Sequence, residues 1–405
     1  MISENIILDW IKAHEPDLLQ FTRDLVATPS INPPGDERAV VNRIDEELGK
    51  WELGKAQIIA AEPHRPNILC QVAGTGPGPT LVFCGHMDTK PAGNRQEWKH
   101  DPLGPVVDGD KLYGLGSSDM KSGIAAMVYA AAALQGCGGL QSGQLHLLFT
   151  ADEEAGSHLG AKFLADNGHV QGDAMLITEP CGVHKELEFI AVDGRGAALF
   201  NFRVYGDQMH SSLGDEFNAV NASVKAAELL ARFDREFKIP GATLNAGAVL
   251  KGGMFYGVVP GMAEFGCDLR VPPGHSQQGV RAKVEQWLEK QKQKDPQLRV
   301  ELQWETPPLG WAEPVSFPRD HPLAIALQDA CRGVLTDSPP FACYPAGTDA
   351  PWFIEAGVPT ISAFGPGLLP LAHSPYEYVQ ISSIYACARI YALAANQYLV
   401  EPTTK

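Results

Sequence analysis

Metal-binding and acid–base side chains recur in this sequence at points where short apolar segments end. His86 and Asp88 follow one such segment, and Glu153 and Glu154 follow another. The remaining candidates lie in loops or after a third apolar segment: Asp119, Glu179 and His373. In open α/β sheets, ligands bind at the carboxyl ends of the strands. The sequence therefore predicts that these groups meet at one edge of a sheet.

Two imidazoles and three carboxylates suit a pair of zinc-class ions that share one carboxylate. Such pairs polarise an attacking water and a scissile carbonyl in hydrolases. His86 and Asp88 are two residues apart, so on extended chain they point the same way and Asp88 can accept the free imidazole N–H. Glu153 and Glu154 are adjacent, so on extended chain one can bind metal while the other acts as a general base.

Each pattern also has a simpler interpretation when it is taken alone. A His-x-Asp sequence is common in surface turns, and a Glu-Glu pair is usually solvated. Asp119 could cap the helix that follows it, and His373 could be a hydrogen-bonded loop histidine. The motifs of P-loops, nucleophile elbows and H-E-x-x-H proteases are absent from the sequence. The metal prediction therefore depends on all the groups arriving in order at the same sheet edge.

Helices and buried strands alternate over the first 182 residues. The N-terminal thirty residues have a helical period that places Leu18, Phe21 and Leu25 on one stripe. Another helix is predicted at 123–134, and strands are predicted at 80–86, 145–150 and 174–178. This alternation predicts an α/β fold with a mostly parallel mixed sheet and helices on both faces.

The pattern changes after Gly182. Strand-like segments are expected at 189–205, 243–250, 263–271 and 298–304, with helices at 218–233 and 276–293. This β-α-β-β-α-β order is that of a ferredoxin-like α+β unit. From about residue 309 the chain returns to Gly/Pro-punctuated apolar segments. We therefore predict a metal-binding catalytic domain built from 1–182 and 309–405, with a smaller domain, 183–308, inserted into it.

Composition excludes several classes of protein. The 405 residues carry 32 Lys+Arg and 48 Asp+Glu, a formal net charge of −16, which argues against nucleic-acid and anionic-membrane partners. At 44% hydrophobic and 20% charged residues, the composition is that of a globular protein. The longest strongly apolar run, 124–134, has about half the length that a bilayer requires. The N-terminus lacks the features of a signal peptide, and eight cysteines without a Cys-x-x-Cys pair favour a reducing, cytoplasmic location.

Several motifs taken together resemble those of one enzyme family. They are Gly85-His86-Met87-Asp88, Ser118-Asp119-Met120-Lys121-Ser122-Gly123, Asp152-Glu153-Glu154-Ala155-Gly156, Thr178-Glu179-Pro180, His210-Ser211-Ser212, Gly347-Thr348-Asp349-Ala350 and Ala372-His373-Ser374-Pro375-Tyr376-Glu377-Tyr378. Over nearly its whole length, the chain looks like the acetylornithine deacetylase, succinyl-diaminopimelate desuccinylase and aminoacylase family of two-zinc metallopeptidases. The resemblance implies a zinc-exopeptidase-like fold with an inserted lid and dimerisation domain.

The resemblance also implies which groups bind metal. His86, Asp119 and Glu179 would hold one ion, while Asp119, Glu154 and His373 would hold the other, so that Asp119 is the bridge. Zinc is the first expectation for both divalent ions, and cobalt or manganese are the alternatives.

Catalytic roles and one backbone feature follow from the same resemblance. Asp88 would orient His86, and Glu153 would deprotonate the attacking water and later protonate the leaving amine. A cis peptide is expected between Asp119 and Met120. One departure is Leu115, which stands where many members have arginine.

Substrate contacts are expected mainly from the lid. His210 matches a histidine that stabilises the oxyanion, often in the active site of a partner subunit, and Arg270 matches an arginine that binds a substrate carboxylate. Asn245 resembles a substrate-binding asparagine, while Gly347, Thr348 and Asp349 would shape the pocket floor. Without the resemblance, His210 would be interpreted as a solvated loop residue, Arg270 as an exposed charge, and the Gly347-Thr348 segment as turn geometry.

The expected function is hydrolysis of the amide bond of an N-acyl amino acid by a homodimer formed through the lid. A di- or tripeptidase or carboxypeptidase with the same metal pair is the alternative. A non-catalytic binding protein on this fold is disfavoured because every ligand and the base are present.

Overall fold

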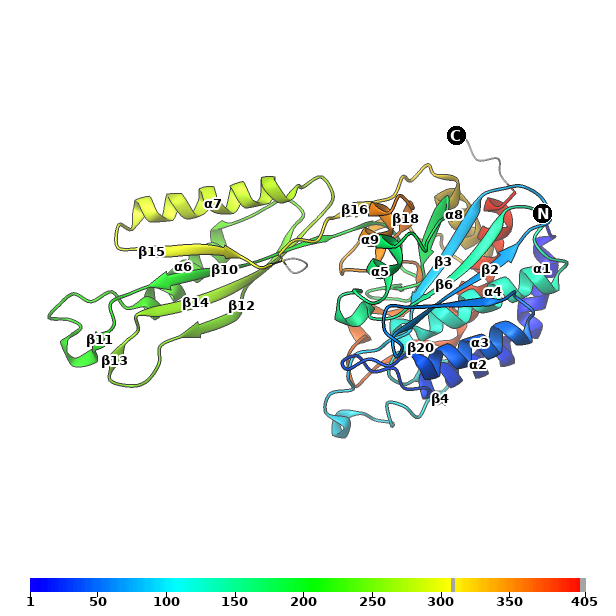
Figure 1. Cartoon of the computed structure of the whole chain (residues 1–405), viewed down its shortest axis with the longest axis horizontal. Coiled ribbons are helices and arrows are strands. Elements are labelled where there is room, and N and C mark those ends of the chain that lie inside the picture. Colours follow the sequence, from blue (N-terminus) through cyan, green and yellow to red (C-terminus); the bar gives the residue numbers. More distant parts are fainter. Residues whose placement is uncertain (307–309, 401–405) are drawn as a thin grey trace. The chain divides into compact units, whose positions relative to one another are not determined.

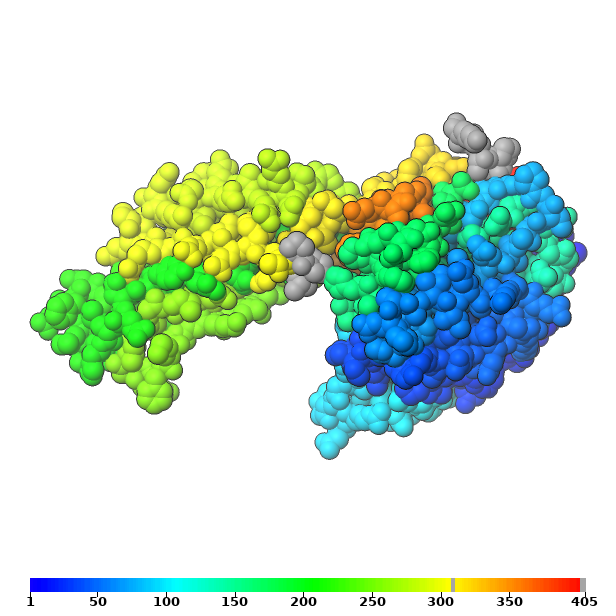
Figure 2. All heavy atoms as spheres, in the orientation of Figure 1, coloured from blue at the N-terminus to red at the C-terminus, as the bar shows by residue number. Residues whose placement is uncertain are grey.

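The computed structural model describes residues 1–306 and 310–400, and the chain divides into two compact units. Unit 1 consists of Met1–Asp193, Ser316–Tyr344 and Thr348–Lys405, and unit 2 consists of Gly194–Val315 and Pro345–Gly347. The domain limits expected from the sequence stay predictions, and the limit between 308 and 309 lies outside the described residues. Figure 2 shows that N-terminal segments in blue and C-terminal segments in orange pack into the body of unit 1.

Unit 1 is built on a mixed sheet whose strands lie in the order β1-β2-β6-β3-β7-β18. Their bounds are β1 (Ala56–Ala60), β2 (Pro66–Ala73), β6 (Gln144–Thr150), β3 (Thr80–His86), β7 (Ala174–Ile177) and β18 (Thr360–Ile361). Strands β6, β3, β7 and β18 are mutually parallel, whereas β1 and β2 pair antiparallel at one edge. The parallel strands β3, β6 and β7 are almost entirely buried, as expected for strands covered on both faces.

Helices cover this sheet, and Figure 1 shows α2, α3 and α4 running along it. The helices of unit 1 are α1 (Glu4–Ala13), α2 (Glu15–Ala27), α3 (Arg38–Lys50), α4 (Ser122–Gly136), α5 (Ala161–Asp166), α8 (Pro322–Val334), α9 (Ala350–Glu355) and α10 (Ile381–Tyr398). Helix α4 is apolar all round and buried from Ser122 to Leu134, because it packs against α10 as well as the sheet. The predicted stripe of Leu18, Phe21 and Leu25 on α2 is buried.

Short strands complete unit 1 around the main sheet. They are β4 (Val106–Asp108), β5 (Lys111–Tyr113), β8 (Pro180–Gly182), β9 (Ile190–Gly194), β16 (Val315–Ser316), β17 (Phe341–Tyr344), β19 (Gly365–Leu368) and β20 (Tyr378–Gln380). The last residue of β9 and the first residue of β16 are counted with unit 2. The pairing of β19 with β8 and of β20 with β5 joins the C-terminal segment to the N-terminal one.

Unit 2 contains an antiparallel sheet in the order β12-β14-β10-β15. Its elements are β10 (Gly196–Tyr205), β11 (Met209–His210), α6 (Ala222–Glu236), β12 (Thr243–Gly252), β13 (Val258–Val259), β14 (Met262–Val271), α7 (Gln277–Lys294) and β15 (Arg299–Trp304). The order of the long elements along the chain is β-α-β-β-α-β, which confirms the predicted ferredoxin-like unit.

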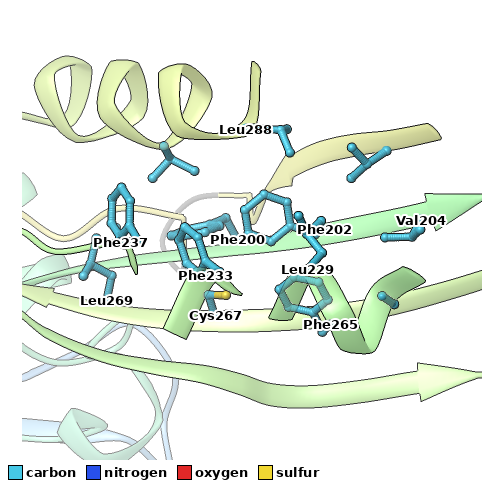
Figure 3. Packing of buried hydrophobic residues seen from close by; sticks show 14 of the residues in the cluster. Phe200, Phe202, Val204, Leu229, Phe233, Phe237, Phe265, Cys267, Leu269 and Leu288 are labelled. Atoms are coloured by element: carbon cyan, nitrogen blue, oxygen red, sulfur yellow. The ribbon is translucent and has the colours of Figure 1, made fainter. Parts of the chain in front are cut away.

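The core of unit 2 lies between this sheet and helices α6 and α7. Along β10 the even-numbered residues, including Phe200 and Phe202, are buried, while the odd-numbered ones are half-buried on the other face. Figure 3 shows Phe200, Phe202, Phe233 and Phe265 packed against one another in this core. The alternating period of the sequence therefore determines which face of the sheet the helices cover.

The state of the cysteines and the length of the apolar helices complete the description of the fold. Seven cysteines are free thiols: Cys70, Cys84, Cys137, Cys181, Cys267, Cys331 and Cys387. Within residues 1–306 and 310–400, no helix is both long enough and apolar enough to cross a bilayer.

Candidate metal centre

Three of the candidate ligands and the candidate base lie at the ends of neighbouring strands. His86 is the last residue of β3, Glu153 and Glu154 follow β6, and Glu179 follows β7. Strands β6, β3 and β7 are adjacent and parallel, so their carboxyl ends meet at one edge. The topology therefore brings together residues that are far apart in the sequence.

Asp119 lies between two imidazoles. The Nε2 atom of His86 is 2.9 Å from Asp119 Oδ1, and the Nε2 atom of His373 is 3.2 Å from Asp119 Oδ2. Each imidazole also has its own glutamate: Glu179 Oε1 is 3.4 Å from His86 Nε2, and Glu154 Oε1 is 3.0 Å from His373 Nε2. The two groups of donor atoms thus share the carboxylate of Asp119.

The loop that carries Asp119 is held in place by a buried carboxylate. The backbone N–H groups of Ser118 and Asp119 donate to Glu377 Oε1, with distances of 2.9 and 3.2 Å. The peptide between Asp119 and Met120 is cis, as the resemblance implied. Helix α4 then begins so close to β7 that a Cβ on Gly123 would lie 2.2 Å from the carbonyl oxygen of Thr178. Glycine is therefore required there for the loop to reach the sheet.

The environment of His86 differs in one detail from the prediction. Its Nδ1 atom is 3.0 Å from the backbone oxygen of Asp88 and 3.5 Å from the carboxylate Oδ1. The carboxylate instead accepts the backbone N–H groups of Glu153 and Glu154, at 3.2 and 3.1 Å, and the amide of Asn32 at 2.8 Å. Asp88 therefore connects the imidazole to the segment that carries the two glutamates.

Glu153 and Glu154 do not lie on extended chain, so the geometric reason given for their different roles is wrong. They form a 3₁₀ turn, Glu153–Ala155, which follows Asp152 in the left-handed conformation at φ 66°. The turn forms because Asp88 accepts two successive N–H groups at its start. Glu154 is buried and contacts His373, whereas Glu153 is half-buried.

Electrostatics favour cations at this cluster. Burial and the neighbouring Asp119 raise the pKa of Glu179 to about 8, and burial with the Glu179 charge raises the pKa of Glu153 well above its usual value. Hydrogen bonds with Asp119 and Glu154 raise the pKa of His373 to about 10. Although burial opposes it, the carboxylates of Glu179, Asp119 and Asp88 raise the pKa of His86 well above its usual value. Crowded carboxylates of this kind repel one another unless positive charge is bound.

The donor set fits two divalent ions. The atoms of His86, Asp119 and Glu179 lie within 4.8 Å of one another, and so do those of Asp119, Glu154 and His373. Imidazole nitrogen and carboxylate oxygen are ligands that zinc and related ions take in catalytic sites.

A buried ionic network lies behind the glutamate turn. Arg65 donates to both carboxylate oxygens of Glu37 at 2.8 Å and to Asp152 Oδ1 at 3.0 Å. Asn32 connects Asp152 to Asp88 through its amide group, at 3.1 and 2.8 Å. This network is not predictable from the sequence, because its members are scattered along the chain and carry no recognisable motif.

Asp349 supports the same region from the C-terminal part of the chain. Its carboxylate accepts hydrogen bonds from Thr150, at 3.2 Å, and from Ser157. Burial raises the pKa of Asp349 to about 6. Neighbouring Thr348 accepts the N–H of Ala350 through its hydroxyl, at 3.2 Å, and Gly347 is exposed.

The candidates in unit 2 occupy two places within that unit. Arg270 lies on β14, where its guanidinium pairs with Asp268 at 2.8 Å, and Asn245 lies opposite Asp268 on β12. His210 lies on β11 and is exposed, with its Nδ1 accepting the N–H of Ser212. The roles of these three residues stay predictions.

Two residues near the cluster were also missed, and the sequence held a signal for each. Glu377 lies within the motif that contains His373. Lys90 follows His86 and Asp88 at the same spacing of two, and its Nζ is 3.2 Å from Glu154 Oε2. The alternation on extended chain that relates His86 to Asp88 also predicts that Lys90 lies on the same side.

Comparison with known proteins decides the family. Residues 82–397 match the family described as peptidase family M20/M25/M40. The chain belongs to this family. As a member of M20, it is a metallohydrolase that acts on C–N bonds.

Relatives of this M20 chain are similar over nearly the full length of both proteins. The chain is 26% identical to a probable succinyl-diaminopimelate desuccinylase of Staphylococcus aureus (strain MRSA252), covering 96% of this chain and 98% of the relative. It is 28% identical to an acetylornithine deacetylase of Vibrio atlanticus (strain LGP32), covering 95% and 99%. The crystal structure of aminopeptidase PepT from Bacillus cereus has the same fold, with a TM-score of 0.74 at 18% identity over 95% and 98% of the two chains.

Proposed function

We propose that this M20 metallohydrolase removes the acyl group from an N-acyl amino acid by using two divalent ions, zinc before cobalt or manganese. The observation that carries the proposal is the position of Asp119, whose two carboxylate oxygens face two different imidazoles. The similarity to a desuccinylase and a deacetylase supports an N-acyl amino acid as substrate.

The residues that would hold the ions are those of the two donor groups. His86, Asp119 and Glu179 would bind one ion, and Asp119, Glu154 and His373 would bind the second. Ions held there would polarise the amide carbonyl and lower the pKa of the attacking water.

Glu153 is the proposed general base. Its carboxylate would take a proton from the attacking water and deliver it to the nitrogen of the leaving amine. Asp88 fixes the backbone of Glu153 through the N–H bond at 3.2 Å, which limits the positions that the carboxylate can take. In the same reaction, the imidazole of His210 would donate a hydrogen bond to the oxyanion of the tetrahedral intermediate.

Unit 2 is the proposed source of substrate contacts. The guanidinium of Arg270 is partly exposed beside Asp268, and its fork of donors suits a substrate carboxylate. Asn245 on the next strand would bind another polar group of the substrate. Gly347 and Thr348 would shape the floor of the pocket.

A homodimer through unit 2 completes the proposal. Strand β12 is an edge strand of its sheet, and edges with unpaired backbone groups favour pairing with another chain. Large apolar side chains are exposed in the same unit: Phe217, Val224, Leu250, Met254, Phe255 and Tyr256. Light scattering should give the mass of two chains, and a monomer at every concentration would reject this part of the proposal.

A peptidase activity is the second candidate, because the family that matches is described as a peptidase family. The same donor groups and base would serve it, with a dipeptide or tripeptide in place of the N-acyl amino acid.

A substrate screen with defined metal content tests the proposal. The purified chain, loaded with zinc, cobalt or manganese, is assayed on N-acetyl and N-succinyl amino acids and on di- and tripeptides. Faster hydrolysis of N-acyl amino acids supports the proposal, and faster hydrolysis of peptides supports the second candidate. Two bound ions without hydrolysis of any amide would reject both.

A further inference from the structure

Lys90 lies beside the candidate metal centre, and it is neither a proposed metal ligand nor the proposed base. Its backbone N–H donates to Glu154 Oε1 at 3.2 Å, and its ammonium is 3.2 Å from Glu154 Oε2. The ammonium also donates to the backbone oxygen of Glu154. Because His373 is 3.0 Å from Oε1 of the same carboxylate, Glu154 lies between a proposed metal site and a lysine.

Lys90 differs from the buried cations in the same unit. Lys121 is 1% exposed, and its ammonium donates to the carbonyl oxygens of Leu25 and Thr28 at 2.9 and 2.7 Å. The guanidinium of Arg65 is hydrogen-bonded to the carboxylates of Glu37 and Asp152. The side chain of Lys90 is 35% exposed and therefore accessible to a molecule from solution.

The charge balance at Glu154 changes when a cation binds there. A divalent ion held by Glu154 shares the negative charge that otherwise attracts the Lys90 ammonium, and it repels that ammonium at short range. Lysine is a compact charge on a flexible stem, so its ammonium can move to another anion within reach. An anion arriving from the exposed side would restore the lost partner.

We propose that Lys90 binds a substrate carboxylate next to the scissile amide. The inference rests on the proposed function, because it concerns the substrate of that same site. It adds that this substrate must carry a carboxylate. Two parts of such a substrate can supply the carboxylate: the α-carboxylate of the amino acid, or the free end of a dicarboxylic acyl group. Both would form a charge-assisted hydrogen bond with the ammonium.

Two substrate pairs distinguish these sources. The first pair is an N-acetyl amino acid and its carboxamide, which differ in the α-carboxylate. The second pair is an N-succinyl amino acid and its N-succinamoyl analogue, which differ at the end of the acyl chain. The experiment compares wild type with Lys90→Met, Lys90→Arg and the control Lys99→Met. It measures the ratio of kcat/KM within each substrate pair and the number of metal ions bound per chain. Lys99 is an exposed lysine, 3.5 Å from Asp108, outside the proposed site.

The expected result is selective. Lys90→Met should reduce the preference for the carboxylate in one pair by roughly 10- to 100-fold, the range of one hydrogen bond to a charged group. Lys90→Arg should retain most of the preference, and Lys99→Met should match wild type. The pair that responds identifies which carboxylate is bound.

Other outcomes would overturn the inference. Unchanged ratios in both pairs would show that Lys90 does not bind a carboxylate. A loss of bound metal with equal effects on all four substrates would show that Lys90 acts only through Glu154. If wild type with two bound ions hydrolyses none of the substrates, the proposed function is rejected and the Lys90 inference with it. If wild type is active and Lys90→Met leaves the ratios unchanged, only the Lys90 inference is rejected.

Discussion

The two donor groups that share Asp119 contain the same kinds of atoms but lie in different surroundings. In the inner group, the side chains of His86 and Glu179 are 1% and 6% exposed and follow central strands of the sheet. In the outer group, the side chain of His373 is 45% exposed and belongs to a loop residue at φ 60°. Glu154, its partner, also contacts Lys90.

This difference indicates that the two proposed metal sites have unequal affinities. Ligands on packed strands are already in position when an ion arrives, so little conformational entropy is lost on binding. A histidine on an exposed loop loses more freedom, and a lysine beside its glutamate competes with the ion. The inner site should therefore retain its ion longer than the outer site.

Removal of Asp119, the proposed shared ligand, should have the largest effect. Asp119→Ala should eliminate both ions and lower activity by at least about 10³-fold, because each proposed site loses a carboxylate. Metal content by mass spectrometry and hydrolysis rates check this, with circular dichroism as the control for folding. A folded variant that keeps two ions would show that Asp119 is not the bridge.

Replacement of Glu153, the proposed base, should separate its effect on the reaction rate from any effect on metal binding. Glu153→Gln should lower kcat by about 10²- to 10⁴-fold, the usual contribution of a general base, while both ions stay bound. Glu153→Asp should recover part of the rate, since it keeps a carboxylate. Activity equal to wild type in Glu153→Gln would remove Glu153 from its proposed role.

Histidine variants test the inequality directly. His373→Ala should leave one tightly bound ion, whereas His86→Ala should lose the inner ion and also lower thermal stability, because it empties a buried position. Titration of the metal-free variants with zinc in a calorimeter gives the number and affinity of the sites. Equal affinities in the two variants would show that burial does not determine the order of binding.

The sequence predicts the sheet edge well and its support poorly, and the reason is physical. His86, Glu154 and Glu179 were expected together because strand and helix periods place them at the ends of parallel strands. The turn at Glu153 was not expected, because it depends on a carboxylate of Asp88 that accepts two N–H groups from a distant segment. Contacts of this kind between residues far apart in the sequence leave no local periodic signal.

The buried network of Arg65 reaches both groups. Its chain of contacts ends at Asp88, which lies beside His86 of the inner group and accepts the backbone N–H of Glu154 of the outer group. Arg65→Met should therefore weaken both sites by about tenfold or more. Leaving Glu37 buried without its partner should cost about 3–5 kcal/mol of unfolding free energy. Denaturant titration measures this cost, and calorimetry measures the affinity.

The matched control for Arg65 is another arginine–aspartate pair that is exposed. Arg38 pairs with Asp36 on the surface, so Arg38→Met should change neither stability nor metal affinity appreciably. If Arg65→Met lowered stability but left the affinity of both sites unchanged, the network would not act on the donor groups through Asp88.

The smallest expected effect is on how stability depends on pH, and it distinguishes a loss of stability in acid from a loss of bound metal in acid. His146 lies near the start of β6, while Glu153 and Glu154 follow its end, and burial lowers the pKa of this imidazole. The unfolded chain then binds the proton more readily, so the contribution of His146 to stability is complete above about pH 6.5 and decreases as the pH falls below that value. His146→Leu should reduce this pH dependence in metal-free protein, as measured by denaturant titration between pH 5 and 8, without changing how many ions the chain binds at neutral pH. The imidazole lies toward the other end of β6 from both donor groups. If the free energy of unfolding fell equally with decreasing pH in variant and wild type, the acid sensitivity would come from the proposed metal ligands and not from His146.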